Sequence, residues 1–202
     1  MMRVMGDAAV GFRVHSGWAT AVLLAGPAAG PEVADRRVVQ LADPEVPDSR
    51  QPYHAGLDLP KGEAARIVAR LVRSVERFAR RSLIDLFKSY RVGGHRLLAA
   101  GIVVDSNVDP TMIKNDHIRA HAEEGQLFRV VIQDAVQSRG LALPVTVTVE
   151  KELFVTASRK LGIPERRLKE KVGALGRQLD GPWRAEERAA ALAAWVVLLR
   201  RR

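Results

Sequence analysis

The sequence predicts a mixed α/β fold in which three antiparallel strands and a β-α-β-α-β succession form one five-stranded sheet, with helices on both faces and a helical carboxyl end. Three observations predict this order. Short apolar runs bounded by Gly and Pro recur at strand length, two long segments carry apolar residues at helical spacing, and a β-branched run follows the second segment. With 47% hydrophobic and 27% charged residues, 202 residues are enough for one packed domain over 1–202.

Three strands are expected first, followed by a long loop. Ser16 and Gly17 supply a tight turn, so the first two strands should form a hairpin. Arg36 and Arg37 indicate that the third strand lies at an edge or has an exposed face. The loop holds four prolines, and loops of this length are typically functional or disordered. The expected ranges are 8–14, 18–25 and 33–41 for the strands and 43–60 for the loop.

Helices and buried strands alternate through the rest of the chain. Ile67, Leu71, Val75 and Phe78 repeat at helical spacing and predict a long amphipathic helix. The run RLLAAGIVV is typical of a strand buried on both faces, and VTVTV is strongly β-branched. The expected elements are a helix over 62–90, a strand over 96–104, a helix over 116–139 closed by Gly140, a strand over 143–149, and helices over 151–161, 164–179 and 185–199.

Several classes of site and location are excluded by composition. The chain has no cysteine, which excludes disulfides, thiolate zinc sites, iron–sulfur clusters and cysteine nucleophiles. The first residues lack the order of a signal peptide, and no apolar stretch is long enough to span a bilayer. We therefore expect a cytoplasmic protein with no membrane partner.

Basic residues are the strongest binding signal. The chain carries 32 Lys and Arg against 23 Asp and Glu, a net charge of +9, and residues 200–202 form a basic tail. Arginines recur every three or four residues along the first predicted helix and should line one stripe, as phosphate neutralisation requires. A solvated helix face is the alternative interpretation. The stripe consists of Arg66, Arg70, Arg73, Arg77 and Arg80, and a second basic run lies over 159–171.

One short segment carries groups suited to chemistry. On a helix, His117, His121 and Glu124 fall at i, i+4 and i+7 and share one face. Histidine acts as acid, base or metal ligand, and a histidine pair at this spacing can chelate a metal. Asp105 follows the predicted buried strand, where α/β sheets place ligands, and is expected near this helix. The alternative is that these polar groups only cap and pack the start of the helix.

Local motifs agree with a known family. Residues 11–18 stand where that family has Gly-hydrophobic-Asp-Pro-Gly-Ser, and Gly125-Gln126 and 140–145 resemble its Gly-Gln pair and its approach to the fifth strand. Glu186-Glu187 before an Ala-rich run resembles its acidic last helix. Over about residues 8–199 the chain thus resembles the ribonuclease H-like superfamily, and within it the bacterial Holliday-junction resolvases. The resemblance implies the ribonuclease H-like fold and nuclease chemistry.

That resemblance also implies Mg²⁺ or Mn²⁺, because these enzymes hold two metal ions with carboxylates from the first strand, the fourth strand and the last helix. Asp105 matches the fourth-strand acid and Glu187 one last-helix acid, so both are the implied metal ligands. Arg13 stands in place of the first-strand acid and Ala190 in place of the second last-helix acid. A guanidinium there would repel a metal ion, which predicts a degenerate or rewired metal site.

Two functions remain open. The first is a nucleic-acid-associated protein that binds structured DNA or RNA through the basic helix. It would either bind without cutting or cut through a rearranged set comprising Asp105, His117, His121, Glu124 and Glu187. The second is a non-catalytic interaction module of the same fold, as a homodimer or with an acidic protein partner.

Overall fold

The predicted five-stranded mixed sheet is confirmed in a computed structural model, which describes residues 6–138 and 141–199. The strand order is β3-β2-β1-β4-β5. β1 pairs antiparallel with β2 and β2 with β3, whereas β1–β4 and β4–β5 are parallel. The strands are β1 (Gly6–His15), β2 (Trp18–Ala25), β3 (Glu32–Gln40), β4 (His95–Val104) and β5 (Val145–Val149).

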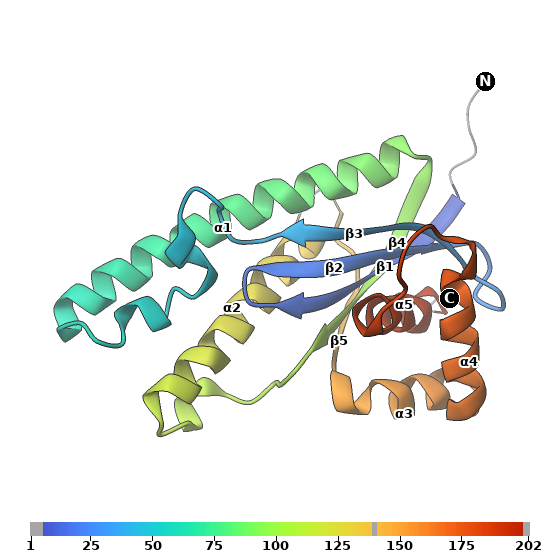
Figure 1. Cartoon of the computed structure of the whole chain (residues 1–202). Helices are drawn as coiled ribbons and strands as arrows, with labels where there is room; N and C mark the ends of the chain where they lie inside the picture. Colours follow the sequence, from blue (N-terminus) through green and yellow to red (C-terminus); the bar gives the residue numbers. More distant parts are fainter. Residues whose placement is uncertain (1–5, 139–140, 200–202) are drawn as a thin grey trace.

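Helices cover both faces of the sheet, as Figure 1 shows. One face packs against α1 and α2, and the other against α3, α4 and α5. The predicted tail over 200–202 and the predicted helix end at Arg139 and Gly140 lie outside the described residues. The helices are α1 (Lys61–Val92), α2 (Asp116–Gln137), α3 (Glu150–Leu161), α4 (Glu165–Leu175) and α5 (Ala185–Leu198).

Side chains that alternate along β1 divide between two hydrophobic clusters. Val10, Phe12 and Val14 point into the cluster with α1 and α2, while Ala9 belongs to the cluster with α5. Gly11 faces α5 as well, because a Cβ there would lie 1.8 Å from the Ala190 carbonyl oxygen. Arg13, next on this face, is thereby carried to the start of α5.

The sequence-based boundaries need small corrections. The predicted helix over 164–179 ends earlier, at Leu175, and continues as a 3₁₀ turn, η4 (Gly176–Gln178). The proline-rich loop is also more regular than predicted, because it contains two 3₁₀ turns, η1 (Pro47–Arg50) and η2 (His54–Gly56), both of which contact α1. The loop therefore packs on the long helix and holds its own side chains in place.

Candidate functional site

Acidic residues gather where β4 and β5 end. Val104 and Val149 are paired across these two parallel strands, and Asp105 and Glu150 directly follow them. Since parallel strands end at the same edge of a sheet, the two carboxylates are neighbours. Glu186, in the first turn of α5, approaches from the helical layer.

Arg13 occupies the centre of this acidic group. Its side chain is 4% exposed, and its Nη2 donates hydrogen bonds to Asp105 and, at 2.8 Å, to Glu150 Oε2. Its Nε lies 3.7 Å from Glu186 Oε2, and its Nη1 donates to the Val14 carbonyl at 2.8 Å. We call Arg13, Asp105, Glu150 and Glu186 the Arg13 cluster.

Charge holds the Arg13 cluster together. Burial by itself would lower the pKa of Arg13, but the hydrogen bond to Asp105 and the charges of Asp105 and Glu150 outweigh it, and the pKa is raised. Arg13 is therefore permanently cationic. Its guanidinium lies between the carboxylates that would have to ligate a divalent ion, so these residues do not fit a two-metal carboxylate centre.

Of the two acids that open α5, Glu186 is the one that faces the Arg13 cluster. Its Oε2 lies 2.7 Å from His15 Nε2, and the His15 ring stacks on Trp18 with centroids 4.2 Å apart. Glu187 instead accepts a hydrogen bond from the Arg184 backbone N–H at 2.9 Å and caps the helix. The structure thus does not bring Glu187 together with Asp105.

The predicted histidine face of α2 is present, and it meets a third histidine from the loop. The rings of His54, His117 and His121 lie 4.2–4.8 Å apart between centroids. Glu124 lies beneath them with its side chain fully buried, and its Oε1 lies 2.8 Å from His54 Nδ1. We call His54, His117, His121 and Glu124 the histidine cluster.

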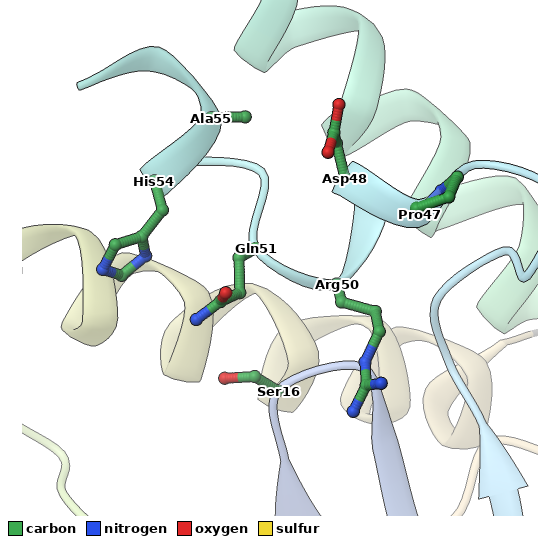
Figure 2. Close-up of a pocket in the computed structure, with 7 residues that line it drawn as sticks. All are labelled: Ser16, Pro47, Asp48, Arg50, Gln51, His54 and Ala55. Carbon is green, nitrogen blue, oxygen red and sulfur yellow. The ribbon is translucent and has the colours of Figure 1, made fainter. Parts of the chain in front are cut away.

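Two hollows flank the histidine cluster. One, of about 410 Å³, is lined by Asp105, His15 and His121 among others, so the Arg13 cluster and the histidine cluster open onto the same cleft. The other, of about 440 Å³, lies between the η1–η2 loop and the β1–β2 turn. Figure 2 shows Ser16, Arg50 and Gln51 around this second hollow, with the His54 ring directed towards α2. Asp105 and His121 therefore line one cleft.

The predicted arginine stripe is exposed along α1. Buried side chains such as Leu71, Val75 and Leu83 face the sheet, and the arginines project from the opposite face of the helix. The second basic run lies on α3 and α4, across the sheet from α1, so the two runs do not form one surface. The arginine stripe consists of Arg66, Arg70, Arg73, Arg77 and Arg80.

Comparison with known proteins identifies the fold. RuvC of Thermus thermophilus matches 94% of this chain and 92% of its own, with a TM-score of 0.53 and 12% sequence identity. The chain has the ribonuclease H-like fold of RuvC. A second structure, T. thermophilus RuvC in complex with a Holliday junction substrate, matches with a TM-score of 0.54, 9% identity and coverage of 94% and 91%. The sequence matches no family model and no curated protein.

Sequence reasoning did not assign three residues of these clusters to the site. Glu186 differs from Glu187 by one residue, or about 100° around the helix, and only the packing of α5 decides which acid faces Arg13. His54 lies in an aperiodic loop, two residues after Pro52, which gives no signal for its position. Glu150 directly follows β5, as Asp105 follows β4, and that shared position was the available signal.

No helix within 6–138 and 141–199 is long and apolar enough to cross a membrane.

Proposed function

We propose that this protein binds structured nucleic acid through the arginine stripe of α1, without two-metal hydrolysis at Asp105. The exposed stripe on the face of α1 opposite the core carries the proposal. Five guanidinium groups in a row match the requirement for neutralising a series of phosphates. The RuvC-like fold supports the same substrate class, because a RuvC with this fold is bound to a Holliday junction. A four-way DNA junction is therefore the first ligand to test.

The Arg13 cluster supports binding without this hydrolysis. The guanidinium of Arg13 is tied to three carboxylates at the edge where the family resemblance implies Mg²⁺ or Mn²⁺. We expect Mg²⁺ to give no cleavage of the bound junction. A product that forms with Mg²⁺ in the wild type and not in Asp105→Asn would instead support the rewired nuclease.

Binding is tested by fluorescence anisotropy with junction, duplex, single-stranded DNA and structured RNA at about 50–200 mM salt. Arg70→Ala with Arg73→Ala should weaken binding about tenfold and reduce the slope of log affinity against log salt by about 2. The matched control is Arg159→Ala with Lys160→Ala, which removes the same charge from α3 across the sheet. This control should leave the slope close to wild type.

Two results would contradict the proposal. Equal losses in both double variants would mean that net charge, and not the stripe, sets the affinity. No salt-dependent binding of any of the four ligands by the wild-type protein would remove nucleic acid as the partner. The stripe would then be a surface for an acidic protein.

A further inference from the structure

We propose that the histidine cluster binds a transition-metal ion of the Zn²⁺ class, with His54, His117 and His121 as ligands and Glu124 as the residue that positions His54. Each histidine offers one ring nitrogen, and these three atoms lie within 4.8 Å of one another. The set is separate from the carboxylates of the Arg13 cluster, and the inference does not depend on nucleic-acid binding.

The contact between Glu124 and His54 distinguishes this cluster from a chance meeting of histidines. A carboxylate oxygen accepts hydrogen bonds, so the 2.8 Å contact to Glu124 Oε1 fits the tautomer of His54 that carries its proton on Nδ1. His54 Nε2 then presents its lone pair. That atom is buried and has no hydrogen-bond partner among the described residues. A carboxylate that fixes the tautomer of a histidine ligand is the usual partner at metal sites.

The burial of Glu124 also favours a cation at this site. A carboxylate with no exposed surface is costly to bury without compensation. The His54 backbone N–H also donates to Glu124 Oε1, at 3.2 Å, while Oε2 has no hydrogen-bond partner among the described residues and lies 4.0 Å from His121 Nδ1. A divalent cation on the neighbouring imidazoles would supply the positive charge that this buried anion lacks.

The ligand type selects the metal. Neutral imidazoles suit Zn²⁺, Co²⁺, Ni²⁺ and Cu²⁺, whereas Mg²⁺ prefers oxygen ligands. Zinc–nitrogen bonds of about 2.0–2.1 Å place tetrahedral ligand atoms about 3.3 Å apart. The ring nitrogens must therefore move closer to one another by about 1.5 Å at most. His117 and His121 are exposed and free to rotate by that amount, while Glu124 keeps His54 in place.

Three protein ligands leave one tetrahedral position open. His121 lines the cleft that Asp105 also lines, and His54 lines the hollow beside Arg50. An open position that faces a cleft is typical of zinc sites that bind water or an anionic ligand, whereas purely structural sites are closed by four protein ligands. The fourth ligand is therefore expected to come from solvent.

The experiment is a titration of the metal-free full chain with Zn²⁺ and, separately, with Co²⁺. Calorimetry should give one Zn²⁺ per chain, and Co²⁺ should give the visible absorption of a four-coordinate site. His117→Gln and His121→Gln should each weaken Zn²⁺ binding at least tenfold, and Glu124→Gln roughly tenfold. His95→Gln is the matched control, because His95 begins β4 and is outside the cluster. This variant should bind like the wild type.

Folding is monitored separately by circular dichroism and by the shift in Tm that Zn²⁺ produces in each variant. His117 and His121 are exposed, so their Gln variants should keep the wild-type fold. Folded variants that have lost the Zn²⁺-induced Tm shift support the proposal. A wild type that binds no Zn²⁺ at micromolar concentration overturns it, as do His117→Gln and His121→Gln variants that bind like His95→Gln.

Discussion

At the scale of single residues, Arg13 determines the chemistry of the acidic site where β4 and β5 end. With a carboxylate at this position, Asp105, Glu150 and Glu186 would surround a site of strongly negative charge. A buried guanidinium converts the same acids into ion-pair partners. One long side chain thereby replaces the counter-charge that metal ions would supply.

Arg13→Asp tests that replacement. The variant removes the cation and adds a fourth carboxylate, so its Tm should fall by several degrees in KCl. Millimolar Mg²⁺ should recover part of the loss, because closely spaced carboxylates are the oxygen ligands that Mg²⁺ takes. Thermal unfolding with and without Mg²⁺, at constant ionic strength, measures both effects. If Mg²⁺ raises the Tm of the wild type equally, Arg13 does not exclude the ion.

Tyr90 gives a prediction about alkaline pH. Burial, and next the charge of Asp35, raise the pKa of Tyr90 above its ordinary value of 10.0, while Arg37 opposes the shift. The folded state then keeps a proton that the unfolded state releases above about pH 10. The contribution of protonated Tyr90 to stability is therefore complete below that pH and is lost progressively above it. Between about pH 9 and 11, the free energy of unfolding measured in urea should fall by about 1 kcal/mol less in Tyr90→Phe than in the wild type. Parallel pH profiles would contradict this assignment.

At the scale of elements, the contact between α5 and the sheet positions the Arg13 cluster. The backbone of α5 touches β1 at Gly11 and β4 at Gly101, where a Cβ would lie 2.5 Å from the Ala193 carbonyl oxygen. This close approach sets both the distance of α5 from the sheet and its rotation about the helix axis. The rotation in turn directs Glu186 to Arg13 and leaves Glu187 as the cap of the helix.

Gly11→Ala should therefore destabilise the protein by about 3 kcal/mol, because the added methyl meets helix backbone that cannot rotate away. The control is Gly125→Ala in α2, where nothing lies within 4 Å of the added Cβ. That variant should gain about 0.5–1 kcal/mol from helix propensity. Urea unfolding of both variants measures the contrast, and a Gly11→Ala variant as stable as the wild type would show that α5 can move.

At the scale of the whole molecule, the fold was more predictable than its sites. Gly and Pro mark the ends of most elements, and the rules for parallel connections leave few sheet orders, so the ribonuclease H-like topology followed from the sequence. The arginine on the first strand was also visible in the sequence. The histidine cluster was visible only as the pair on α2, because His54 arrives through a loop whose path depends on packing against α1. Contacts between segments far apart in the chain carry no periodic signal.

The hydrophobic clusters and the histidine cluster hold different parts of the chain, which predicts the effect of removing a metal ion from the histidine cluster. The two hydrophobic clusters hold the sheet and its helices, whereas the histidine cluster connects the loop over 43–60 to α2. Chelation of a bound Zn²⁺ should therefore leave the amides of β1 and β4 protected from hydrogen exchange and increase exchange around η2 at least tenfold. His117→Gln should show the faster exchange without a chelator. Equal exchange around η2 with and without the metal would mean that packing on α1 alone fixes the loop, because a ligand that binds only the ordered loop must slow its opening.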